Sequence, residues 1–152
     1  MRVEYRYEDR VTADFIELAK ELDGELREIF GEAQSSYDQY NALDGIEDVI
    51  IAHIDSKPVG CASMRRFSED TYEIKRVFVE AGHRKLGIAR ELMRGLEAVA
   101  IRKKASFLIL ETGKRLQPAI RLYKGLAFAE TENYGQYAGM AESLCMKKRL
   151  RG

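Results

Sequence analysis

Residues 84–89 read Arg84-Lys85-Leu86-Gly87-Ile88-Ala89, and they stand between a strand-like run, Thr71–Val79, and the most regular helical pattern of the chain, which begins at Ile88. The first turn of a helix has backbone N–H groups without intrahelical partners and carries the positive end of the helix dipole. A glycine in front of that turn lets a ligand approach the backbone closely. This order of strand, loop and helix therefore predicts a binding site for a phosphate group.

Two other phosphate-binding loops share part of this pattern, and the residues exclude both. Gly82 and Gly87 have the spacing that opens a P-loop, but Ile88 and Ala89 occupy the positions at which that loop needs Lys and then Ser or Thr. Without those two side chains nothing reaches the terminal phosphates or holds magnesium, so NTP hydrolysis is excluded. The G-x-G-x-x-G pattern of dinucleotide-binding loops is also absent.

Hydrophobic periodicity on both sides of the loop predicts the remaining elements. The predicted strands are residues 3–7, 49–54, 59–67, 71–79, 106–111, 128–131 and 144–150. The predicted helices are a long one between Thr12 and Gly31, a short one at 33–43, the one that begins at Ile88, and one at 117–124, and residues 55–58 are a predicted turn. Antiparallel hairpins come first and one strand–helix–strand crossover follows. This order predicts an α/β fold of the mixed, α+β-like kind, with a mostly antiparallel twisted sheet rather than a doubly wound one.

Length and composition limit the classes of protein that the chain can be. With 152 residues, 45% of them hydrophobic, and no linker-like or repeated segment, residues 1–152 are predicted to form a single domain. No apolar run approaches the ~18 residues of a membrane span, and the first residues do not resemble a secretory signal, so we expect a cytoplasmic protein without membrane association. Two cysteines far apart in sequence predict neither a disulfide framework nor a zinc site, and no metal is expected.

The charges are unevenly distributed along the chain although they sum to zero. Residues 1–50 carry 14 acids and 5 bases, whereas the rest of the chain has an excess of bases, several of them around Gly87. A basic focus beside a glycine suggests an anionic ligand. On charge alone, a surface whose bases pair with the acidic part is the simpler interpretation. A neutral total also argues against nonspecific nucleic-acid binding.

Four stretches in order resemble the GCN5-related N-acetyltransferase (GNAT) superfamily, over about residues 47–150. Glu73–Val79 is similar to the family's fourth strand, Arg84–Ala89 to its acyl-CoA pyrophosphate loop, Phe107–Gly113 to its fifth strand, and Gln117–Phe128 to the following helix and its exit. Ala127 stands where the family usually has a glycine before the phenylalanine at that exit.

The resemblance implies the GNAT fold and acetyl-CoA as co-substrate. It implies that the strand Val77-Phe78-Val79 separates from its neighbour through a bulge and holds the pantetheine arm by main-chain bonds, with an N–H near Val79 as donor to the oxyanion. The cofactor-binding residues that it implies are Val77, Phe78, Val79, Arg84, Lys85, Leu86, Gly87, Ile88, Ala89 and Gln117.

The resemblance also implies an N-acetyltransferase that moves an acetyl group from acetyl-CoA to a primary amine by direct attack. Glu73 is the candidate general base, directly or through water, and a surface carboxylate paired with Lys75 or Arg76 is the alternative interpretation. Tyr123 is the candidate general acid for the departing thiolate, and a core tyrosine beside Leu122 is the alternative. A catalytically silent acyl-CoA-binding module and a structural protein with a basic surface loop are the competing functions.

Acceptor specificity in this family usually comes from the first helices and the last hairpin. The corresponding candidates are Gln34, Tyr37, Tyr40, Asn41 and Tyr134, with Tyr137 beside the last of them. Tyrosines can bind cations, and the acids of residues 1–50 can attract one, so we expect a small basic amine or a lysine side chain as acceptor. By analogy with relatives, a homodimer is an expectation.

The cysteines and histidines are not predicted to take part in the chemistry. Cys61 and Cys145 each lie in a strand-like run of apolar neighbours without a recognisable His partner, which predicts buried structural thiols. His53, in an apolar run, is interpreted as structural, and His83 as a loop residue.

Overall fold

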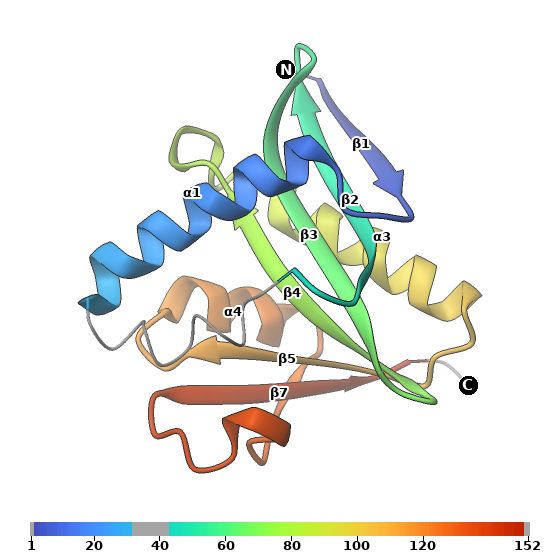
Figure 1. Cartoon of the computed structure of the whole chain (residues 1–152), viewed down its shortest axis with the longest axis vertical. Coiled ribbons are helices and arrows are strands. Elements are labelled where there is room, and N and C mark those ends of the chain that lie inside the picture. Colours follow the sequence, from blue (N-terminus) through green and yellow to red (C-terminus); the bar gives the residue numbers. More distant parts are fainter. Residues whose placement is uncertain (1, 32–42, 151–152) are drawn as a thin grey trace. The chain divides into compact units, whose positions relative to one another are not determined.

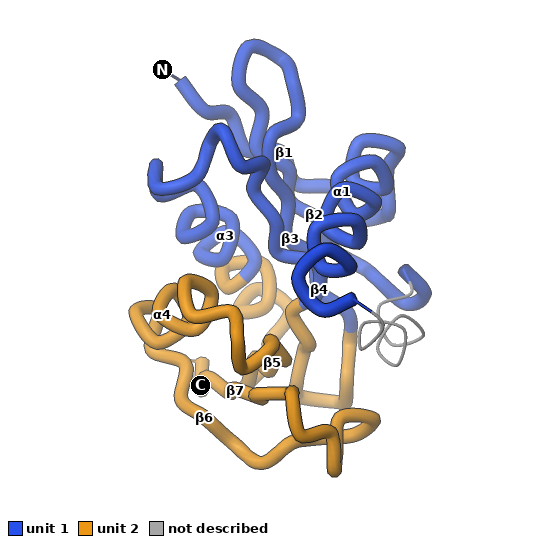
Figure 2. The backbone as a smooth tube through the Cα atoms, turned by 90° about the vertical axis from the view of Figure 1, so that its left-hand side faces the viewer, with its two compact units in different colours: residues 1–65, 75–96 blue, residues 66–74, 97–152 orange. Residues whose placement is uncertain are grey.

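The computed structural model describes residues 2–31 and 43–150. The chain divides into two compact units, residues 1–65 with 75–96, and residues 66–74 with 97–152 (Figure 2). Hydrogen-bonded strands among the described residues follow the order β1-β2-β3-β4-β5-β7-β6. This is the mixed α/β fold expected from the sequence, and the prediction of fold class is confirmed.

The first unit is built on antiparallel strands. Its elements are β1 (Val3–Glu8), α1 (Ala13–Phe30), β2 (Ile46–Ile54), most of β3 (Lys57–Ser68), the end of β4 (Thr71–Val79), η3 (Ala81–His83) and the first half of α3 (Ile88–Arg102). β2 pairs antiparallel with both β1 and β3. Figures 1 and 2 show α1 and α3 on opposite faces of these strands. β2 is therefore covered on both sides, which explains its long apolar run, whereas β1 remains mostly exposed.

The helix α1 begins and ends as its sequence predicts. The Thr12 hydroxyl accepts a hydrogen bond from the backbone N–H of Phe15 (3.4 Å), and Gly31 follows the last turn with φ 58°. Phe15 and Leu18 are buried in a cluster with residues of the strands. The apolar stripe of α1 thus packs on the sheet, as expected for an amphipathic helix.

The hairpin between β2 and β3 is tighter than the sequence predicts. Only Asp55 and Ser56 form the turn, with φ 52° and 67°, and Lys57 and Pro58 already belong to β3. The predicted turn at 55–58 is therefore wrong at its second half. Two central residues with positive φ give the two-residue turn whose twist matches that of the flanking strands.

The second unit contains the end of β3, the beginning of β4, the second half of α3 and, within its described residues, five further elements. They are β5 (Phe107–Gly113), α4 (Gln117–Gly125), β6 (Ala129–Thr131), η4 (Gly135–Tyr137) and β7 (Ser143–Arg149). β4 pairs parallel with β5, whereas β7 pairs antiparallel with both β5 and β6. The parallel pair confirms the single crossover that the sequence predicts. The helix expected at 33–43 falls almost wholly outside the described residues.

None of the helices in the described ranges combines the length and the apolar character that a membrane crossing requires.

Candidate active site

The loop before α3 has the backbone conformation of an anion-binding turn. Lys85 and Gly87 have φ values of 66° and 80°, and the first bond of α3 runs from the N–H of Glu91 to the carbonyl of Gly87 (3.2 Å). The N–H groups of the helix's first turn consequently have no partner within the helix. Ile88 is 2% exposed and anchors the start of α3, whereas Leu86 is 52% exposed. The main chain of residues 85–90 thus presents donors from a fixed helix end.

The Arg84 side chain fastens this loop to its own unit. Its Nε donates to the carbonyl of Val79 (2.7 Å), and its Nη2 donates to both carboxylate oxygens of Glu25 of α1 (2.9 and 2.7 Å). It also lies over the Phe78 ring, 5.7 Å from the centroid. The charge of Arg84 is therefore balanced by Glu25. Within Arg84–Ala89, the exposed Lys85 is the cationic side chain that can face a ligand.

The end of β4 carries a local distortion at the place where a bulge is expected. Arg76 has φ 53° inside the strand, and its guanidinium forms an ion pair with Asp23 of α1. A left-handed residue within a strand is typical of a bulge. Beyond Arg76, Val77 is half-buried, and Phe78 and Val79 are buried. In the parallel ladder with β5, Thr71–Glu73 are the β4 residues that pair.

Glu73 is a buried carboxylate rather than a surface one. It is 1% exposed, and its Oε2 accepts a hydrogen bond from the hydroxyl of Tyr134 (2.7 Å). Burial, together with the charge and hydrogen bond of Glu73, raises the pKa of Tyr134 above its usual value. The tyrosine therefore stays protonated and remains the donor. Arg76, which with Lys75 was one of the two partners considered for Glu73 from sequence, forms an ion pair with Asp23.

Tyr123 is held by the end of α4. The N–H of Phe128 bonds to the carbonyl of Tyr123 (3.0 Å), and the two rings make an edge contact with centroids 6.0 Å apart. The Tyr123 side chain is buried, and burial, with a smaller effect of the Glu111 charge, raises its pKa. Glu111 itself accepts a hydrogen bond from Ser143 (2.7 Å). Tyr123 is thus a fixed, protonated phenol.

The two cysteines and His53 are buried, as predicted. Burial raises the pKa of Cys61 to about 12 and that of Cys145 to about 11. Thiols with such pKa values are poor nucleophiles at neutral pH. His53 is 4% exposed, and its Nε2 lies 3.7 Å from an Asp14 carboxylate oxygen.

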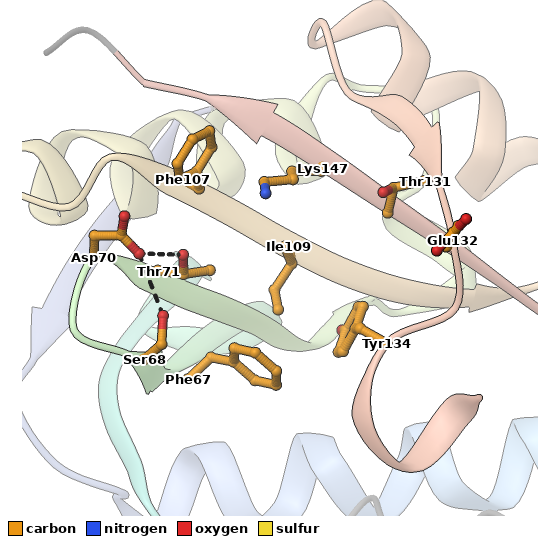
Figure 3. Close-up of a pocket in the computed structure, with 10 residues that line it drawn as sticks. All are labelled: Phe67, Ser68, Asp70, Thr71, Phe107, Ile109, Thr131, Glu132, Tyr134 and Lys147. Carbon is orange, nitrogen blue, oxygen red and sulfur yellow. Dashed lines mark hydrogen bonds between the residues drawn. The ribbon is translucent and has the colours of Figure 1, made fainter.

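A pocket of about 360 Å³ opens on the second unit, and its lining includes Tyr134, the hydrogen-bond partner of Glu73 (Figure 3). Its lining comes from the adjoining ends of β3 and β4 and their turn, from β5 and β7, and from the end of β6 and the segment after it. The lining residues are Phe67, Ser68, Asp70, Thr71, Phe107, Ile109, Thr131, Glu132, Tyr134 and Lys147. Only Tyr134 among them is a site residue predicted from sequence. Alternation of side chains shows which residues of β5 share a face and which residues of β7 share a face. The register between strands, which puts Ile109 and Lys147 in one row with Glu73, cannot be predicted from the sequence.

The other predicted site residues are placed as follows. Gln117 is exposed at the start of α4, where its side-chain amide donates to the carbonyl of Lys114 (3.0 Å). Gln34, Tyr37, Tyr40 and Asn41 lie outside the described residues. Within residues 2–31 and 43–150, the structure contains no group of His, Cys, Asp and Glu side chains suited to a metal ion.

Comparisons with known proteins identify the family of the chain. The model of the acetyltransferase (GNAT) family matches residues 15–128. An IAA acetyltransferase of Azospirillum brasilense is 31% identical over 137 residues, which cover 89% of this chain and 90% of that protein. Among solved structures, a Klebsiella pneumoniae protein named as an acyl-CoA N-acyltransferase has a TM-score of 0.81 at 25% identity, with 98% of each chain covered. A GNAT family acetyltransferase of Elizabethkingia anophelis, solved with acetyl-CoA bound, has a TM-score of 0.72 at 17% identity. The match covers 97% of this chain and 98% of that protein. The chain belongs to the acetyltransferase (GNAT) family.

Proposed function

We propose that this protein transfers the acetyl group of acetyl-CoA to the primary amine of a small acceptor by direct attack. The observation that carries the proposal is the backbone of residues 85–90, where left-handed Lys85 and Gly87 lead into the start of α3. Family membership supplies the class of reaction, and this loop supplies the matching donors for a diphosphate.

The main chain of the loop would hold the diphosphate, and the exposed Lys85 would add positive charge. Because the Arg84 guanidinium is already paired with Glu25, we assign the Arg84 side chain a role in positioning the loop. Its backbone N–H is one of the main-chain groups of this loop. Val77, Phe78 and Val79 would contact the pantetheine arm through main-chain groups, since two of the three side chains are buried. Gln117, exposed at the start of α4, would contact the same cofactor.

A protonated amine has to lose two protons, and the departing thiolate has to gain one. The ammonium gives its first proton to Glu73, directly or through water, and the freed lone pair forms the C–N bond with the thioester carbonyl. The nitrogen gives up its second proton to solvent as the tetrahedral intermediate collapses to the amide. The oxyanion is stabilised by an N–H near Val79 until the C–S bond breaks. Tyr123 then gives its phenolic proton to the thiolate and regains one from solvent. The products are the acetylated amine and coenzyme A with a free thiol.

Glu73 is suited to act as base because a hydrogen bond from a neighbouring residue orients its buried carboxylate. The Tyr134 hydroxyl donates to Oε2 of the carboxylate (2.7 Å) and fixes its orientation, and an ionised carboxylate has several lone pairs that can accept a proton. Glu73→Gln should lower kcat at pH 7 much more than at pH 9, where more of the amine is already neutral. An unchanged pH–rate profile would remove Glu73 from this role.

Tyr123 is a weaker acid than a free tyrosine because burial raises its pKa. Each unit of difference between donor and acceptor pKa adds about 1.4 kcal/mol to the proton transfer. The transfer to sulfur is therefore uphill, and it is favoured only as the C–S bond breaks. Tyr123→Phe should lower kcat and leave the Kd for acetyl-CoA nearly unchanged; full activity would assign the step to water.

A thiol-release assay tests the proposal as a whole. Acetyl-CoA is mixed with the protein and a panel of primary amines, and free thiol is followed together with the mass of the acetylated product. We expect amine-dependent thiol release, lost in Glu73→Gln at pH 7. Binding of coenzyme A without release for any amine would favour the silent acyl-CoA-binding module instead.

A further inference from the structure

One row across the sheet of the second unit joins an acid, an apolar residue and a base. Glu73 on β4 pairs with Ile109 on β5, and Ile109 pairs with Lys147 on β7. Residues paired in this way point to the same face of a sheet. With a spacing of ~4.8 Å between strands, the Cα atoms of Glu73 and Lys147 are about 10 Å apart.

The pocket described above lies on this face. Ile109 and Lys147 line it, and Tyr134, the hydrogen-bond partner of Glu73, forms part of its wall. Figure 3 shows Ile109 between Lys147 on one side and Phe67 and Tyr134 on the other. The rings of Phe67 and Tyr134 meet edge to face, with centroids 5.3 Å apart, and form an aromatic wall.

Lys147 is the cation of this pocket and is available to a ligand. Its Nζ lies 4.1 Å from the centroid of the Phe107 ring, and among the described residues no carboxylate lies within ion-pair distance of it. The side chain is exposed. Lys148, its neighbour on the opposite face, is instead paired with Glu97 (2.9 Å).

The acids near the pocket are suited to the opposite charge of the same ligand. Asp70 accepts hydrogen bonds from Ser68 (3.3 Å) and Thr71 (2.9 Å), and Glu132 lies beside Thr131 at another side of the pocket. Several acids of residues 1–50, which were expected to attract a cationic acceptor, are paired within the first unit, such as Asp23 and Glu25. The pocket therefore offers a positive side chain, Lys147, and negative side chains, Asp70 and Glu132, to a ligand that carries charges of both signs.

We propose that this pocket binds the acceptor, and that the acceptor is a small amine that also carries a carboxylate. The carboxylate lies against Lys147, the apolar part of the molecule contacts Ile109 and the aromatic wall, and the amine is directed toward Glu73. This inference rests on the proposed function for its reacting amine. It adds the class of substrate, an amino acid or a related amino-carboxylate, and a specificity residue, Lys147.

The test compares acceptors that differ only at the carboxylate. Phenylalanine, phenylalaninamide and phenethylamine form one set, and 4-aminobutyrate and butylamine form a second. Each is measured for KM with acetyl-CoA and, independently of turnover, for Kd by calorimetry with protein saturated with coenzyme A. We expect at least one carboxylate-bearing compound to bind about tenfold or more tightly than its partner, the effect of one charge-assisted hydrogen bond.

The variants separate a specificity role from a structural one. Lys147→Met should raise the KM and Kd of the amino-carboxylate about tenfold, leave those of the plain amine unchanged, and be rescued by Lys147→Arg. Lys148→Met is the matched control on the opposite face and should show no such selectivity. Equal or tighter binding of the plain amines, or of a lysine-containing peptide, would overturn the inference. Carboxylate-selective binding without thiol release would instead retain the pocket and reject the transferase function.

Discussion

Replacement of Ala127 by glycine should stabilise the protein. Ala127 follows α4 with φ 73°, a left-handed conformation that glycine adopts without steric cost. Two hydrogen bonds define the motif: the N–H of Phe128 bonds to the carbonyl of Tyr123 (3.0 Å), and that of Ala127 bonds to Lys124 (3.0 Å). This is the Schellman arrangement, in which glycine is the usual residue at the position of Ala127.

The magnitude follows from two opposing terms. A left-handed residue with a Cβ costs about 1–2 kcal/mol relative to glycine. The greater freedom of glycine in the unfolded chain returns roughly 0.4–1 kcal/mol of that gain. Ala127 is exposed, so no packing is lost on removal of its methyl group. The net expectation for Ala127→Gly is about 1 kcal/mol of added stability, or a rise in Tm of roughly 2–4 °C for a chain of this length.

Thermal and urea unfolding of both proteins measure this difference. Ala138→Gly is the matched control, because Ala138 is also exposed but has φ −57°, where glycine brings no relief and only the entropic cost. The control should lose up to about 1 kcal/mol. If Ala127→Gly loses stability as the control does, Ala127 is not held in the left-handed conformation and the reasoning fails.

Three further predictions concern buried groups. Cys61 and Cys145, with pKa values of about 12 and 11, should resist iodoacetamide at pH 8 in the folded protein and react after unfolding; rapid alkylation of the native protein would contradict their burial. The pKa of Tyr123 is raised in the folded state, so its contribution to stability is present below about pH 10 and is lost above it. In Tyr123→Phe, the decline of the unfolding free energy near pH 11 should therefore be shallower by about 1.4 kcal/mol per pH unit. An identical slope in both proteins would show that this phenol titrates normally. A Cβ on Gly60 would lie 3.1 Å from the carbonyl oxygen of Phe78, so Gly60→Ala should cost about 1–3 kcal/mol in urea unfolding, and a neutral result would mean that β3 and β4 are less closely packed.

The sequence predicts the elements of this fold well because each carries a local pattern. The cap at Thr12, the stop at Gly31 and the apolar run of β2 are properties of neighbouring residues, and they place the ends of these elements within a few positions. The hairpin turn is the exception. Two-residue hairpin turns with positive φ usually include a glycine, and Asp55-Ser56 has none. The predicted turn is therefore two residues too long.

The partners of the site residues could not be predicted in the same way. The contact of Glu73 with Tyr134 joins residues 61 positions apart, and the pairing of Arg84 with Glu25 joins residues 59 positions apart. Sequence patterns indicate which face of an element is apolar, but not which residue of another element meets it. The charged residues near Gly87 therefore suggested an anion site more broadly than the structure supports, since the Arg84 charge is balanced within its own unit.

Binding of a diphosphate at the start of α3 can be measured by titrating the isotope-labelled protein with coenzyme A and following the backbone amide chemical shifts. We predict saturable binding with the largest shifts at the amides of Lys85–Arg90. We also predict lower affinity for pantetheine, which lacks the phosphates, and weaker binding of coenzyme A in Gly87→Ala, because the φ of 80° at Gly87 disfavours a side chain. Absence of binding, or shifts that leave the start of α3 unchanged, would contradict these predictions.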